Sequence, residues 1–128
     1  MGRIVGIDFG TSNSSVAFHD GKSAQIIEMA DGSRLLPSVI AFTDDHNVLV
    51  GNSAISAGKI DPVNCHRHIK RLMGEVWNRS ENTGAQTVEG DDGNTWLKGP
   101  DRNYAPAEFA AVIISALLDA AEAKLDER

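Results

Sequence analysis

The chain has 128 residues, 41% of them hydrophobic and 23% charged, and a net charge of −6. This composition is typical of one compact globular domain rather than a disordered chain, and the acidic balance argues against non-specific nucleic-acid binding. The sequence has no apolar run of membrane-spanning length, no signal region and a single cysteine, Cys65, so we expect no membrane association and a reducing, cytoplasmic setting.

Residues 4–18, IVGIDFGTSNSSVAF, form the first stretch with a chemical signature. An apolar run leads to one carboxylate, Asp8, and a polar turn begins at Gly10. Alternation then resumes with Val16 and Phe18 on one face, so the pattern predicts a β-hairpin.

The turn of this hairpin has the residues of an anion site. We expect Gly10 to adopt backbone angles closed to other residues and to leave room for a ligand beside the main chain. Successive N–H groups in such a turn form an anion-binding concavity, and Thr11, Ser12 and Asn13 add short side-chain donors. Asp8 would suit a hydrated Mg²⁺.

The spacing alone is equally compatible with an ordinary hairpin, in which Asp8 and Thr11 only satisfy turn hydrogen bonds. The Walker pattern G-x-x-x-x-G-K-[ST] and the dinucleotide pattern G-x-G-x-x-G are both absent from the chain. Any bound nucleotide would therefore have to be held by the hairpin.

Three Asp-Gly pairs, at 20–21, 31–32 and 92–93, predict turns between strands. The first should join the hairpin to a strand over 24–29, and the second should lie in a turn over 30–34. An extended run follows over 36–42, with Pro37 at its start or edge. A turn at 44–47 leads into a strand over 48–50, so the first fifty residues predict an antiparallel meander.

Helices are predicted after residue 51. Asn52 is a plausible N-cap for a short helix that ends at Asp61-Pro62. A second short helix is expected over 65–73, followed by Gly74 as a C-cap candidate. Its apolar face would comprise Cys65, Ile69, Leu72 and Met73.

Residues 75–86 are polar and predict a loop, whereas 87–89 and 95–97 could pair as a small hairpin. We expect Trp77 and Trp96 to be packing residues rather than a ligand platform.

The last helix is predicted from Pro106 to about residue 126, with Glu108 in its first turn. It is apolar around most of its circumference, which is typical of a helix buried on two sides. The chain therefore either associates or is part of a larger protein, and we favour the second.

Other candidate sites are weak. Cys65, His66 and His68 lack the four-ligand pattern of a structural zinc site. Nothing in the spacing selects a catalytic base, and Lys70 taken alone reads as a solvated helix cation.

Four segments together resemble the 70-kilodalton heat-shock protein (DnaK-type) chaperone family. They are GIDFGTSNSSVA, LPSVIAF, LVGNSA and IKRLMG, in this order and at these distances. The resemblance runs from residue 3 to about residue 125 and is weakest over 75–103.

This resemblance implies an α/β fold, the actin-like ATPase (ribonuclease H-like) fold. Residues 1–128 would be the N-terminal part of its first lobe, a mainly antiparallel meander plus helices. The second lobe and the peptide-binding domain would be absent from this chain.

The resemblance also implies roles for particular residues. Gly10, Thr11, Ser12 and Asn13 would hold the β- and γ-phosphates of ATP, and Asp8 would hold Mg²⁺ through water. Lys70 would act as the catalytic residue at the γ-phosphate, which reverses its reading as a surface cation. The family typically has leucine where Phe9 stands and a second threonine where Ser12 stands.

The implied function is that of an ATP-dependent chaperone active in protein folding and stress response. Hydrolysis of ATP to ADP and phosphate would be coupled to the binding of unfolded polypeptide. A J-domain co-chaperone and a nucleotide exchange factor would be its partners in the full-length parent, whereas the isolated chain should be inactive. The alternatives are a sugar kinase of the same superfamily, which leaves IKRLMG unexplained, and a non-catalytic interaction domain with this fold.

Overall fold

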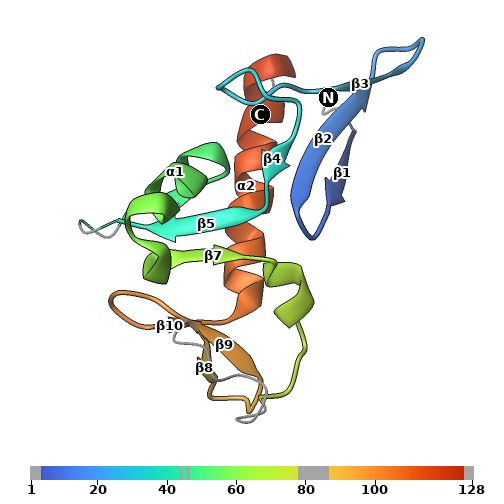
Figure 1. Ribbon diagram of the computed structural model, residues 1–128. Helices are drawn as coiled ribbons and strands as arrows, with labels where there is room; N and C mark the ends of the chain where they lie inside the picture. Colours follow the sequence, from blue (N-terminus) through green and yellow to red (C-terminus); the bar gives the residue numbers. More distant parts are fainter. Residues whose placement is uncertain (1–3, 44, 46, 78–86, 126–128) are drawn as a thin grey trace.

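A computed structural model describes residues 4–43, 45, 47–77 and 87–125 (Figure 1). These residues form three antiparallel sheets, two α-helices and two short 3-10 helices. The long helix α2 (Pro106–Leu125) begins at the third sheet and runs past the second sheet to the first. Parts of the predicted turn at 44–47, of the loop at 75–86 and of the last helix fall on residues 44, 46, 78–86 and 126, outside the described residues.

The first sheet contains the predicted hairpin, which is confirmed. Strands β1 (Val5–Phe9) and β2 (Asn13–His19) pair antiparallel, with Phe9 opposite Ser14. Strands β3 (Ala24–Ile26) and β4 (Leu36–Pro37) also pair with β2, near its two ends. The strand expected over 24–29 is shorter than predicted, because the Met29 N–H donates across the next turn to the carbonyl of Ser33.

The three Asp-Gly turns are confirmed, and each glycine has a positive φ, from 80° to 96°. Their aspartates accept backbone N–H groups of the turn. Asp20 accepts from Lys22 and Ser23, and these bonds lower the pKa of its carboxyl group. The turns are therefore specified locally by residue type.

The second sheet has the order β6-β5-β7, with β5 (Val39–Phe42) between β6 (Val48–Val50) and β7 (Cys65–Arg67). The run predicted over 36–42 breaks at Ser38, where the chain passes from the first sheet to the second. The predicted antiparallel pairing of the first fifty residues is confirmed. They do not form one meander, since they contribute to two sheets.

The helix predicted over 65–73 is also wrong. Residues 65–67 form β7 instead, because they complete the backbone ladder of β5, with Cys65 opposite Ala41. His68 then adopts the left-handed conformation, with φ 56°, and turns the chain into the 3-10 helix η2 (Ile69–Leu72). Gly74 follows with φ 77°, a conformation typical of the glycine that was predicted to end the helix.

Helix α1 (Asn52–Ile60) forms where it was expected and ends at Asp61, before the 3-10 helix η1 (Pro62–Asn64). Its N-cap is Gly51 rather than Asn52. Gly51 has φ 76°, a conformation that favours glycine, and a Cβ at this position would force the Leu36 side chain to shift. The amide of Asn52 donates instead to the Asp31 carboxylate, at 2.9 Å.

The third sheet has the order β10-β9-β8 and includes the predicted small hairpin. It consists of β8 (Thr87–Glu89), β9 (Thr95–Lys98) and β10 (Asn103–Tyr104). The ring of Trp96 packs over Gly90 and its indole N–H donates to Asp92 at 2.9 Å. Trp96 therefore serves the packing of the hairpin, as predicted.

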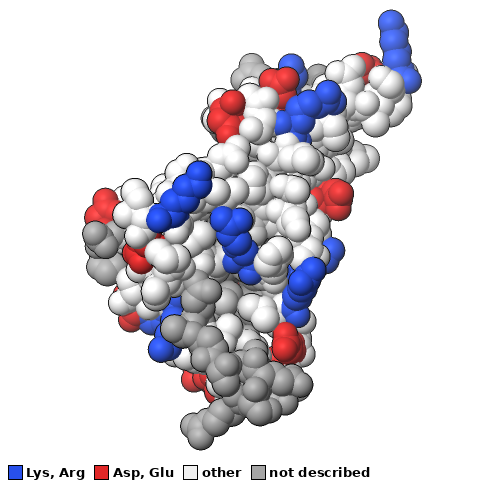
Figure 2. Space-filling model, viewed as in Figure 1, with Lys and Arg blue, Asp and Glu red and all other residues white. Residues whose placement is uncertain are grey.

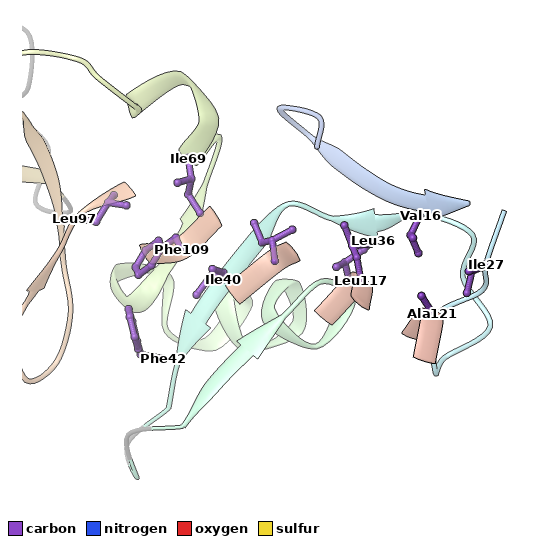
Figure 3. Close-up of a cluster of buried hydrophobic side chains, with 11 residues drawn as sticks. Val16, Ile27, Leu36, Ile40, Phe42, Ile69, Leu97, Phe109, Leu117 and Ala121 are labelled. Carbon is purple, nitrogen blue, oxygen red and sulfur yellow. The ribbon is translucent and has the colours of Figure 1, made fainter. Parts of the chain in front are cut away.

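Helix α2 begins at Pro106 as predicted. The Glu108 carboxylate accepts the N–H of Ala105 at 2.8 Å and pairs with Arg102 at 2.9 Å, which stabilises the first turn. Figure 3 shows side chains of this helix in the core, among residues from all three sheets. The core includes Val16, Leu36, Ile40, Phe42, Ile69, Leu97, Phe109, Ile113 and Leu117.

The opposite side of α2 is open, and Leu118 is 41% exposed. Within the described residues the helix is thus buried on one face, not on the two that its apolar circumference suggested. No helix among those residues is long and apolar enough to cross a membrane. Figure 2 shows basic and acidic side chains interspersed over the visible face, without a continuous band of one sign.

A buried histidine links the second and third sheets. His66 on β7 is 1% exposed and lies against Phe42 and Phe109, with ring centroids 6.1 and 5.3 Å away. Its Nε2 lies 2.9 Å from the carbonyl oxygen of Lys98, which can only accept, so Nε2 carries the proton. Its Nδ1 has no partner among the described residues, and burial lowers the pKa of the imidazole.

This arrangement predicts a loss of stability in mild acid. Below about pH 6.5 the unfolded chain takes up a proton on His66 that the folded chain resists, so the free energy of unfolding falls as pH falls, by up to about 1.4 kcal/mol per pH unit. Urea titrations between pH 5 and 7.5 measure this slope. His66→Leu should flatten it while lowering stability at every pH through the unpaired Lys98 carbonyl. Equal slopes in both proteins would contradict the assignment.

Candidate phosphate-binding site

The turn between β1 and β2 presents hydrogen-bond donors to solvent. Ser12 and Asn13 are exposed and Thr11 is half-buried. The backbone N–H groups of Thr11 and Ser12 donate to no acceptor within the described part of the chain. Adjacent unpaired N–H groups with short hydroxyl side chains are a suitable surface for an anion.

Gly10 is required for a different reason from the one expected. Its φ is not positive, so the turn does not depend on an unusual backbone angle there. A Cβ at this position would instead overlap the carbonyl oxygen of Asn13. The constraint is the close approach of two backbone segments across the turn.

Ser38 binds the turn on its buried side. Its N–H donates to the Ser12 carbonyl at 2.9 Å, and its hydroxyl donates to the Gly10 carbonyl at 3.0 Å. The Ser38 hydroxyl also lies 2.9 Å from that of Ser14. Sequence reasoning assigned no role to Ser38, although the segment LPSVIAF that contains it was part of the resemblance.

Lys70 reaches this turn from 61 residues away. Its Nζ donates to the carbonyl oxygen of Phe9 at 2.7 Å and lies 5.8 Å from the centroid of the Phe9 ring. Ile69, which is 1% exposed, anchors η2 in the core against α2. The lysine is exposed, as its reading as a solvated helix cation expected, but its ammonium group is held at the start of the turn.

Asp8 is exposed on β1, opposite Ser15 and two residues before Gly10. No group of three or more His, Cys, Asp or Glu among the described residues could hold a metal ion directly. Cys65 and His66 are successive residues of a strand and so lie on opposite faces. Asp8 is a single exposed carboxylate near the turn, and a Mg²⁺ held by such a group would keep most of its waters.

These residues form one open wall rather than a closed pocket. A wide groove of about 1190 Å³ lies elsewhere, lined by Phe18, Met29, Asn52 and Ala120 among others, and includes none of the residues of the turn. Lys70, the turn N–H groups and the hydroxyls all donate, so the wall can bind the oxygens of a phosphate chain from one side.

Comparison with known families places the chain in one of them. A family model described as Hsp70 protein matches residues 4–128. The matched range includes the hairpin, Ser38, Lys70 and the whole of α2. Because the match covers nearly the whole sequence, the chain belongs to the Hsp70 chaperone family.

Proposed function

We propose that this chain forms one wall of the ATP-binding cleft of an ATP-dependent chaperone. The observation that supports this most strongly is the contact between Lys70 Nζ and the Phe9 carbonyl, at 2.7 Å. It brings a cation to the edge of a turn that already presents N–H and hydroxyl donors.

In this proposal the residues of the turn, Gly10 to Asn13, hold the β- and γ-phosphates through N–H and side-chain donors. An ammonium group can donate three hydrogen bonds. The Lys70 ammonium donates one of them to the backbone carbonyl of Phe9. The other two are available for the γ-phosphate and the attacking water. A Mg²⁺ at Asp8 would neutralise phosphate charge.

The wall is incomplete by itself, because phosphoryl transfer needs stabilising contacts from several directions. The outer edge of β1 pairs with no described strand, and Ile4 and Ile7 beside it are 92% and 37% exposed. We therefore propose that residues 1–128 are the N-terminal part of the first lobe of an actin-like ATPase domain. The parent protein would add a second lobe and a peptide-binding domain.

In that parent, ATP binding and hydrolysis would alternate the affinity of the peptide site for unfolded polypeptide. Such coupling requires contacts that differ between the two nucleotide states. A J-domain co-chaperone and a nucleotide exchange factor would act on this cycle.

The isolated chain should bind nucleotide poorly. Calorimetric titration of the 128-residue chain with Mg-ATP should show no binding in the micromolar range and no hydrolysis, because only one side of the ligand is contacted. A micromolar dissociation constant would show that the described wall is a complete site.

Removing the lysine should affect chemistry more than affinity. In the full-length parent, Lys70→Ala should lower the single-turnover rate of ATP hydrolysis by about 10²–10³, with a smaller change in nucleotide affinity. Lys59→Ala, which removes an exposed lysine from the last turn of α1, is the matched control and should hydrolyse at the wild-type rate. Equal rates for wild type and Lys70→Ala would refute the role given to Lys70.

Alanine substitutions at Gly10, in the turn, and at Gly6, on β1, form a matched pair that tests the packing of the turn. Gly10→Ala should lower stability by about 1–3 kcal/mol, because the new methyl group overlaps a backbone oxygen, and should weaken ATP binding by the parent. Gly6→Ala meets no atom within 4 Å and should change neither. Thermal unfolding and nucleotide titration of both variants test this, and an unperturbed Gly10→Ala variant would contradict the packing of the turn.

A further inference from the structure

We infer that Ser38 is a positioning residue for the phosphate site, and that it fixes the turn at 10–13 relative to Lys70. This inference deepens the proposed function and rests on it. Ser38 is not expected to touch nucleotide itself, because it is 2% exposed and binds the turn from behind.

The hydrogen bonds of Ser38 form a directed chain. A serine hydroxyl has one proton, and that of Ser38 goes to the Gly10 carbonyl. The Ser14 hydroxyl must therefore be the donor in the 2.9 Å contact between the two serines. Ser14 is 1% exposed, so water does not compete for these bonds, and two carbonyls of the turn are held by one residue.

Ser38 also lies where the two sheets meet. It follows β4, which pairs with β2, and precedes β5, whose first residue Val39 lies opposite Arg67 on β7. Three residues beyond Arg67, Lys70 returns to the turn at the carbonyl of Phe9. The turn and the lysine are thus attached to the same pair of strands by short connections.

Loss of the Ser38 hydroxyl would leave the Gly10 carbonyl without the hydrogen bond that ties it to the connection between β4 and β5. The donors of the turn would remain, so phosphate could still bind. The bond of the Ser38 N–H to the Ser12 carbonyl and the contact of Lys70 with Phe9 would remain, but the Gly10 carbonyl between them would no longer be held. The turn donors could then shift relative to Lys70, and a misplacement of about 1 Å can lower a catalysed rate about 10²-fold.

The test compares Ser38→Ala with Ile113→Val in the full-length parent. Ile113 is fully buried on α2 and has no hydrogen bond to the turn, so its variant controls for lost stability. We expect Ser38→Ala to lower the single-turnover rate of ATP hydrolysis by about 10- to 100-fold while the dissociation constant for ATP changes by less than about threefold. Ser38→Thr, which keeps the hydroxyl, should restore the rate.

The possible results separate this inference from the function on which it rests. A Ser38→Ala variant that hydrolyses as fast as Ile113→Val, or that loses rate and affinity in equal proportion, overturns the positioning role and leaves the ATPase proposal intact. A wild-type parent that neither binds nor hydrolyses ATP overturns both. If circular dichroism shows that Ser38→Thr is unfolded, the comparison of Ser38→Ala with Ile113→Val decides.

Discussion

The antiparallel pairing of β5 with β7 is the contact on which the candidate site depends. It joins residues 39–41 to residues 65–67 and ends one residue from Ser38 and three from Lys70. Backbone ladders satisfy N–H and C=O groups that would be costly to bury unpaired, so this pairing is stable against small sequence changes. Both attachments of the turn at residues 10–13, through Ser38 and through Lys70, are fixed by it.

Helix α2 supplies the common core that holds the three sheets together. Its buried face carries Phe109, Ile113 and Leu117, and residues from each sheet pack against it. The aromatic group of Phe42, Tyr104 and Phe109 joins the second and third sheets at the N-terminal end of the helix. The hairpin of β1 and β2 packs on the same helix through Val16, so α2 connects the candidate site to the rest of the molecule.

Local chemistry made much of this structure predictable. The hairpin, the Asp-Gly turns and the start of α2 at Pro106 follow from residue types within a few positions of one another. The strand β7 was missed because its partner β5 is more than twenty residues away, and the apolar spacing of 65–73 mimicked a helix. The constraint on Gly10 is a contact with a residue only three positions away, and it was misread because a close backbone approach leaves no pattern in residue type.

The site residues differ in how far the sequence predicted them. The turn donors could be read from residue type, whereas Lys70 was selected only by resemblance and Ser38 was not selected. In the structure both are tied to the turn, by the 2.7 Å contact with Phe9 and the bonds to Gly10 and Ser12. Such contacts depend on the register of paired strands, which a single sequence does not specify.

The most direct test of the proposed site is a crystal structure of the parent protein with Mg²⁺ and a non-hydrolysable ATP analogue. We expect phosphate oxygens within hydrogen-bond distance of the Thr11 and Ser12 N–H groups and of Lys70 Nζ, with Asp8 contacting a water of the metal. An analogue bound elsewhere, for example in the groove beside Met29 and Ala120 with the turn unoccupied, would contradict it.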